Sequence, residues 1–120
     1  MDNTPSGTVE VINVELLGVE FTLMSAGPFQ KFNESISFVV HCQSQEEVDY
    51  YWDKLSSVPE AEQCGWLRDK FGIAWQIIPK QLGVLLFDPD KVKAGRVMQA
   101  MLEMKKINVA ELQKAYNGDL

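Results

Sequence analysis

The sequence has little of what most catalytic and metal-binding sites are made from. Among its 120 residues there is one histidine, His41, so paired-histidine metal sites and the H-E-x-x-H pattern are impossible within one chain. Its two cysteines, Cys42 and Cys64, cannot make a disulfide framework, and no C-x-x-C is present. G-x-G-x-x-G, P-loop and G-x-S-x-G motifs are absent as well. We therefore expect reduced thiols, no metal and no cofactor.

Basic residues are also scarce, and long apolar runs are missing. Seventeen acidic residues against eleven basic ones give a net charge of −6, with no Lys/Arg-rich run, so we expect no nucleic-acid partner. No stretch approaches the roughly 20 apolar residues of a membrane span, so we expect no membrane partner. Residues 1–7 lack the basic and apolar regions of a signal peptide. These absences predict a cytoplasmic protein.

The titratable residues that are present form no catalytic constellation. His41 and Cys42 are neighbours on a predicted strand, so their side chains point to opposite faces and make no nucleophile–base pair. Several carboxylates gather on a predicted helix, where we interpret them as a solvated face: Glu46, Glu47, Asp49 and Asp53. The sequence therefore assigns no catalytic residue.

The stretch from Gln63 to Pro79 predicts a β-hairpin around which the chain is organised. Asp69 to Gly72 carries the turn signal, because Asp favours turn initiation and Gly accepts a positive φ. The strand after it is apolar on both faces apart from Gln76, which predicts a central strand buried on both sides. Pro79 ends it. A buried amide such as Gln76 either finds partners or lines a cavity.

Three further strands and a helix are predicted before this hairpin. Thr8 to Leu16 and Val19 to Met24 form a first hairpin about the turn Leu17-Gly18, and Ile36 to Cys42 is a third strand. Ser44 and Glu47 make a capping box that starts a helix. Its apolar stripe consists of Val48, Tyr51, Trp52 and Leu55. Residues 56–62 form a polar loop with room for a short edge strand.

The segment after Pro79 predicts helices. Lys80 to Phe87 is expected to be an apolar connector, with Asp88 as N-cap and Pro89 as first residue of a helix that runs to about Lys106. Asn108 starts a last helix that ends at Asn117-Gly118. The Met-rich face from Ala94 to Met104 fits two roles, packing against a sheet or forming a subunit interface.

The predicted elements of residues 35–79 follow one another in the order β-α-β-β-β. Several segments match one known family: Gly27-Pro28, Phe32 to Val40, Glu46 to Asp49, Glu62 to Leu67, Asp69 to Gly72, Trp75 to Pro79 and Arg96 to Ile107. By this order and these segments, the chain resembles the PhnB-like branch, labelled 3-demethylubiquinone 3-methyltransferase-like, of the vicinal-oxygen-chelate (glyoxalase/bleomycin-resistance) superfamily. The resemblance covers almost everything from about Gly7 onward.

The resemblance implies an α+β fold, with a glyoxalase/bleomycin-resistance-like βαβββ module preceded by a β-hairpin and followed by C-terminal helices. It implies a single domain over 1–120, with a remnant hairpin of a first module at 8–24, a complete module at 35–79 and a helical extension at 88–118. By this resemblance we expect the chain to lack the first part of the N-terminal module. The positions that hold metal ligands in the family carry Thr22, Met24, Ser35, Ser37 and Gln76 here. Such neutral ligands bind divalent ions weakly, so no metal is expected.

The function implied is binding of a small molecule in a pocket between curved sheets. The expected pocket residues are Met24, Phe38, Trp66, Trp75 and Gln76. The alternatives are a vicinal-oxygen-chelate-type enzyme acting on a small oxygenated substrate, or the methyltransferase activity in the family label. No Gly-rich strand–helix turn for an adenosyl cofactor supports the latter. An inert remnant is a third interpretation.

A homodimer is the expected assembly. A module that lacks two strands and a helix leaves an apolar face and an unpaired strand edge, which proteins cover. A second copy is one such cover, and a two-fold dimer satisfies both chains with one interface. The hairpin of Thr8 to Met24 and the Met-rich helix are the candidate surfaces.

Overall fold

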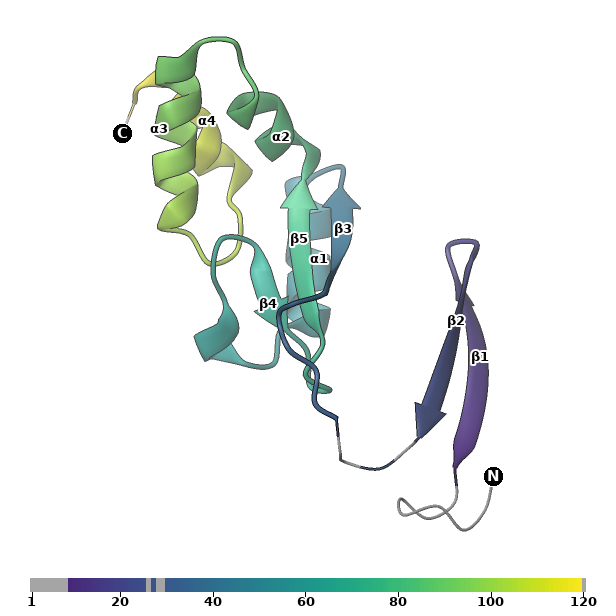
Figure 1. Ribbon diagram of the computed structural model, residues 1–120. Helices are drawn as coiled ribbons and strands as arrows, with labels where there is room; N and C mark the ends of the chain where they lie inside the picture. Colours follow the sequence, from purple (N-terminus) through teal and green to yellow (C-terminus); the bar gives the residue numbers. More distant parts are fainter. Residues whose placement is uncertain (1–8, 26, 28–29, 120) are drawn as a thin grey trace. The chain divides into compact units, whose positions relative to one another are not determined.

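The computed structural model describes residues 9–25, 27 and 30–119 (Figure 1). The chain divides into two compact units, residues 1–31 and 32–120, and each is described by itself. The described residues form five strands in two sheets and four α-helices, which confirms the predicted α+β class. The expected single domain with its three parts stays a prediction.

The first unit contains an antiparallel hairpin of β1 (Glu10–Leu16) and β2 (Val19–Ser25). Its turn is Leu17-Gly18, as predicted, and both turn residues have positive φ, 51° and 80°. Two consecutive positive φ values are what a tight type I′ hairpin turn requires. Thr8, the predicted start of the first strand, lies outside the described residues.

The second unit is built on a three-stranded sheet with the order β3-β5-β4. Its strands are β3 (Ser37–Cys42), β4 (Trp66–Arg68) and β5 (Ala74–Pro79). β5 pairs in parallel with β3 and antiparallel with β4. The predicted hairpin and the central position of its second strand are therefore confirmed. Gly72 in the turn has φ 91°, the left-handed conformation that its sequence position predicted.

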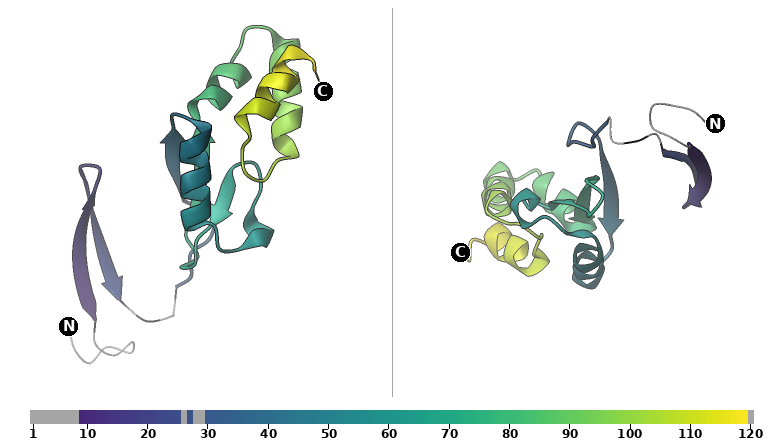
Figure 2. Two further views of the ribbon diagram at one scale, coloured as in Figure 1. Left: turned by 180° about the vertical axis from the view of Figure 1, so that it is seen from behind. Right: turned by 90° about the horizontal axis from the view of Figure 1, so that it is seen from below.

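Helix α1 (Gln45–Leu55) covers one face of this sheet, as Figures 1 and 2 show from front and back. Ser44 accepts a hydrogen bond from the Glu47 amide, which confirms the N-cap, while the Glu47 carboxylate accepts from the Gln43 amide. The predicted stripe packs on a core of buried side chains. That core consists of Cys42, Val48, Leu67 and Ile77, with Tyr51, Trp52, Leu55 and Trp75 partly buried around it.

Two details of this module differ from the sequence prediction. Residues 56–62, predicted to be a polar loop with room for a short edge strand, contain a 3-10 turn, η1 (Pro59–Ala61), and no strand. The segment nevertheless runs alongside β4, because the Ser57 amide donates to the Arg68 carbonyl and Gln63 forms an isolated bridge with Trp66. The prediction that β5 is buried on both sides is also wrong in part, because Gln76 is only half-buried on the face turned away from α1.

Helices α2 (Lys80–Leu86), α3 (Lys91–Leu102) and α4 (Val109–Asn117) gather beyond the end of β5 (Figure 1). The segment expected to be a connector is thus a helix. We attribute this to leucines three and four residues apart, which pack into a shared core. That core consists of Leu82, Leu85, Val97, Ile107 and Leu112, with Ile78 and Leu86 packed against it. None of the described helices combines the length and apolar character needed to cross a membrane.

The ends of the last two helices correct one prediction and confirm another. Asp90, not Asp88, caps α3, because its carboxylate accepts from the amides of Val92 and Lys93. Asp88 instead accepts hydrogen bonds from the Asp90 amide and from the Tyr116 hydroxyl, each at 2.8 Å. The bond from Asp90, and to a smaller extent the bond from Tyr116, lower the pKa of the Asp88 carboxyl group. The α3 helix ends at Leu102, short of Lys106. The predicted α4 caps, Asn108 and Gly118, are confirmed.

The Met-rich face of α3 lies against helices and not against the sheet. Met101 in α3 and Met104, two residues beyond the end of α3, are half-buried and pack on the core formed with α2 and α4. Met98 is 40% exposed. Helix–helix packing therefore accounts for Met101 and Met104, and a subunit interface on this helix stays a prediction.

We predict that Trp75→Ala is among the most destabilising single changes in the second unit. Trp75 packs on the core under α1, and its indole N–H donates a 2.9 Å hydrogen bond to Asp69. Emptying such a site costs about 3 kcal/mol or more of unfolding free energy. Urea unfolding measures this, with Phe71→Ala as the control because Phe71 is 69% exposed. A loss below about 1 kcal/mol for Trp75→Ala would contradict the packing described.

Candidate functional site

The face of the β3-β5-β4 sheet turned away from α1, called the open face below, brings polar and aromatic side chains into rows. Strand register places Trp66 beside Gln76, and Gln76 beside Val39. The neighbouring row contains Arg68, Ala74 and Ser37. Because side chains of a strand alternate between faces, these six residues share one side of the sheet.

Gln76 is held in place at the centre of the open face. Its amide nitrogen donates a 2.9 Å hydrogen bond to the Ser37 hydroxyl, across from β5 to β3. The expectation that this amide finds a partner is therefore confirmed. Gln76 and Trp66 are both half-buried, so each presents part of its surface beyond the sheet.

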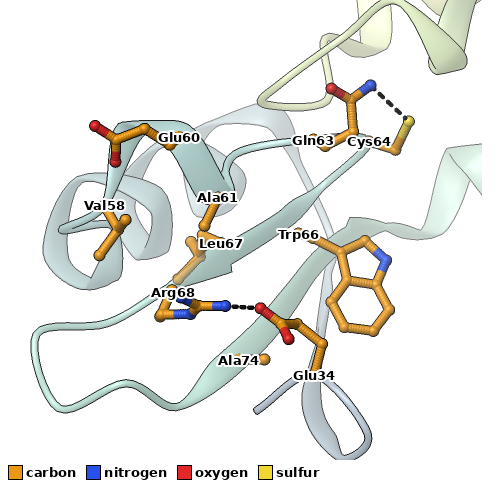
Figure 3. Close-up of a pocket in the computed structure, with 10 residues that line it drawn as sticks. All are labelled: Glu34, Val58, Glu60, Ala61, Gln63, Cys64, Trp66, Leu67, Arg68 and Ala74. Atoms are coloured by element: carbon orange, nitrogen blue, oxygen red, sulfur yellow. Dashed lines mark hydrogen bonds and ion pairs between the residues drawn. The ribbon is translucent and has the colours of Figure 1, made fainter.

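A cavity of about 550 Å³ lies next to this face, between β4 and the η1 segment (Figure 3). Its apolar lining comes from Val58, Ala61, Trp66, Leu67 and Ala74. Its polar lining comes from Glu34, Glu60, Gln63, Cys64 and Arg68. The volume lies in the range of small-molecule sites, and a mainly apolar wall with a few polar groups is the usual composition of such sites.

Arg68 is the polar residue that distinguishes this cavity. One of its terminal nitrogens forms an ion pair with the Glu34 carboxylate, visible in Figure 3. Its Nε atom is buried and has no hydrogen-bond partner among the residues that the structure describes. A buried donor without an acceptor costs about 1–3 kcal/mol. Arg68 is therefore the lining residue with hydrogen-bonding capacity left unused.

The end of the cavity at Cys64 is fixed by a tight turn. Cys64 and Gly65 both have positive φ, 51° and 86°, and Gln63 and Trp66 exchange backbone hydrogen bonds around them. Gly65 is required there, because a Cβ atom would lie 3.0 Å from the Ile78 Cδ1 atom. The amides of Cys64 and Gly65 also donate to carbonyls of residues 104 and 105, each at 2.8 Å. The C-terminal segment thus anchors this wall.

Four of the five residues that the sequence proposed as a pocket lie in the second unit, and its sheet divides them between two faces. Trp66 and Gln76 meet on the open face, whereas Phe38 and Trp75 lie on the side of α1, with ring centroids 5.2 Å apart. Met24 lies on β2 in the first unit, so its part in a pocket with the others stays a prediction. The alternation of β3 and β5 predicts this split. Sequence reasoning missed the cavity residues Glu34, Gln63, Cys64 and Arg68, which only tertiary packing brings together.

The potential metal ligands and nucleophiles lie apart. Among the residues that the structure describes, no three His, Cys, Asp or Glu side chains come close enough to hold a metal ion. His41 is exposed, whereas Cys42 beside it is fully buried. Burial, and to a smaller extent the charge of Glu47, raises the pKa of the Cys42 thiol above its ordinary value. Cys42 is therefore poorly suited to act as a nucleophile near neutral pH.

We predict that the two thiols react with Ellman's reagent in two separate phases at pH 7.5. Cys64 lines the cavity and should react first, whereas Cys42, with no exposed surface and a raised pKa, should react only after the protein opens. Cys64→Ser should remove the fast phase, and Cys42→Ser should leave it intact. A fast phase that survives in Cys64→Ser would show that the burial assigned to Cys42 is wrong.

Comparison with known proteins shows one family. The family model described as 3-demethylubiquinone-9 3-methyltransferase matches residues 1–78, which include β1 to β4, α1 and nearly all of β5. The three C-terminal helices lie outside the match. No curated protein matches the chain. With 78 of 120 residues matched, the chain belongs to the 3-demethylubiquinone-9 3-methyltransferase family, the PhnB-like branch of the glyoxalase/bleomycin-resistance proteins.

Proposed function

We propose that this chain binds a small molecule in the cavity between β4 and η1, against the Trp66 end of the open face. The observation that carries the proposal is Arg68, which lines a cavity of about 550 Å³ and whose buried Nε atom has no acceptor among the described residues. Buried polar atoms in proteins are nearly always satisfied, so an unpaired donor on a residue that lines a cavity supports an acceptor from outside the chain.

The lining favours a neutral, oxygenated molecule with a flat apolar body. Trp66, Ala61 and Ala74 offer a surface on which an aromatic or aliphatic ring can pack. A carbonyl or hydroxyl oxygen would accept from Arg68. An anion is disfavoured, because the two carboxylates in the lining, Glu34 and Glu60, outnumber the single arginine.

The second candidate is an enzyme of the same superfamily that acts on a small oxygenated substrate, or the methyl transfer named in the family description. The family match is the observation in its favour. The two candidates differ in what the purified protein must contain or use. One tightly held divalent ion per chain in elemental analysis, or turnover of a methyl donor, would favour the enzyme over the binding protein.

We predict that 4-hydroxyacetophenone, a neutral ring with a carbonyl acceptor, binds in the cavity and that anionic 4-hydroxybenzoate binds more weakly. In ¹H–¹⁵N NMR titrations the ketone should shift the Arg68 Nε–H and Trp66 indole signals most. Arg68→Met should weaken binding about tenfold, the value of one hydrogen bond to a charged donor. The matched control is Lys70→Met, a nearby exposed cation outside the cavity.

Two results would contradict this proposal. One is that the ketone shifts mainly the NMR signals of residues away from the cavity, and that these shifts saturate as the ketone is added. The other is equal affinity of Arg68→Met and the native protein for the ketone. An unchanged indole signal of Trp75 in the Arg68→Met spectrum would show that the variant keeps its fold, because that indole is bonded to the buried Asp69.

A further inference from the structure

The Arg68 side chain meets a carboxylate of its own chain, Glu34, in the lining of the cavity between β4 and η1. A terminal nitrogen of the guanidinium group, Nη2, forms an ion pair with the Glu34 Oε1 atom (Figure 3). The two side chains come from separate segments, since Glu34 precedes β3 and Arg68 is the last residue of β4. The arginine that a ligand would meet is thus already paired within the protein.

Glu34 uses only part of what the guanidinium group offers. The group presents its N–H donors as a planar fork, to which a carboxylate often binds through two parallel hydrogen bonds. Nη2 of Arg68 is paired with Glu34, whereas Nε on the same edge of the group has no acceptor among the described residues. Glu34 therefore occupies one arm of the fork and leaves the other arm unused.

A local turn holds the Glu34 backbone in this place. The Asn33 Oδ1 atom accepts hydrogen bonds from the amide and the hydroxyl of Ser35, at 2.9 and 2.6 Å. This is an Asx turn, in which an Asn side chain bonds the backbone two residues further on. Glu34 is the residue enclosed by the turn, so its Cα atom is fixed and its carboxylate stays within reach of Arg68.

Folding stability does not account for the pair. The side chains of Glu34 and Arg68 are 57% and 33% exposed. An ion pair in contact with water contributes little to the free energy of folding, because solvent screens it and both side chains lose freedom. Removal of Glu34 should therefore leave the fold intact, and its effect on binding can be measured by itself.

We propose that Glu34 is the residue that sets the charge selectivity of the cavity, because it occupies Arg68 in place of a ligand carboxylate. The inference rests on the proposed function, since it concerns what the same cavity accepts. An anion that approaches Arg68 must displace Glu34 or lie beside its negative charge, and either costs binding free energy. A neutral carbonyl group meets no such repulsion. Without Glu34, the arginine would bind a carboxylate through both arms of its fork.

Titration of the full-length Glu34→Ala variant with 4-hydroxybenzoate tests the proposal. The ¹H–¹⁵N NMR spectra are recorded at slightly acidic pH, where this probe is an anion and 4-hydroxyacetophenone is neutral. Glu34→Ala should bind the benzoate about tenfold more tightly than the native chain, the value of one charge-assisted hydrogen bond. The Arg68 Nε–H signal should shift as the benzoate saturates the variant. Affinity for the ketone should change little.

Three further variants show where any gain in benzoate affinity comes from. The double variant Glu34→Ala/Arg68→Met should lose the gain, because the arginine is its source. Glu34→Gln, which keeps the side-chain shape and removes only the charge, should show a smaller gain in the same direction. The matched control is Glu46→Ala, which removes an exposed carboxylate of α1 outside the cavity lining and should bind benzoate as the native chain does.

Unchanged benzoate affinity in Glu34→Ala would overturn the proposal. A gain that survives in the double variant would also overturn it, because the carboxylate then binds away from Arg68. An equal gain in Glu60→Ala would show that the summed charge of the lining sets the selectivity, and not the occupation of Arg68. All these readings use the benzoate, so they decide the inference whether or not the ketone binds. Failure of the ketone to bind the native chain counts against the proposed function alone.

Discussion

The carboxylate of Asp69 is the constraint on which the second unit depends. It is 7% exposed and accepts three hydrogen bonds, from the amides of Phe71 and Ile73 and from the indole of Trp75, at 2.8, 3.0 and 2.9 Å. These bonds fix the turn between β4 and β5 and so the register of β5. A slip of one residue would exchange the two faces of the strand. Register thus decides that Trp75 packs under α1 while Gln76 and Trp66 reach the open face.

The C-terminal helices complete the site without entering it. Backbone bonds tie the Cys64-Gly65 turn to residues 104 and 105. The Gln45 amide group binds the Ile107 carbonyl and the Val109 amide, at 3.0 and 2.7 Å, which joins the start of α1 to the start of α4. The cavity wall therefore rests on a segment that lies beyond the family match. This arrangement makes the helical extension a support for the proposed binding site.

Local signals in the sequence predicted most of the fold, and tertiary packing explains what they missed. Ser44, Asn108, Gly118 and both hairpin turns were predictable because each uses side-chain or glycine chemistry that acts within a few residues. α2 was not, because Gly83 weakens the local helix signal and its leucines gain from a core formed with α3 and α4. In the site, alternation predicts that Trp66 and Gln76 share a face. Arg68, Glu34 and Cys64 carry no such periodic signal, and only the folded chain brings them to one cavity.

Exchange of the tryptophan indole protons tests the assignment of the two faces most directly. Trp75 donates to buried Asp69 and Trp52 donates to Glu62 at 2.9 Å, whereas the Trp66 indole has no hydrogen-bond acceptor among the described residues. In ¹H–¹⁵N spectra recorded after transfer to D₂O, the Trp66 signal should disappear first and the Trp75 signal should be strongly protected. Rapid loss of Trp75 together with a persistent Trp66 signal would contradict the register and the site built on it.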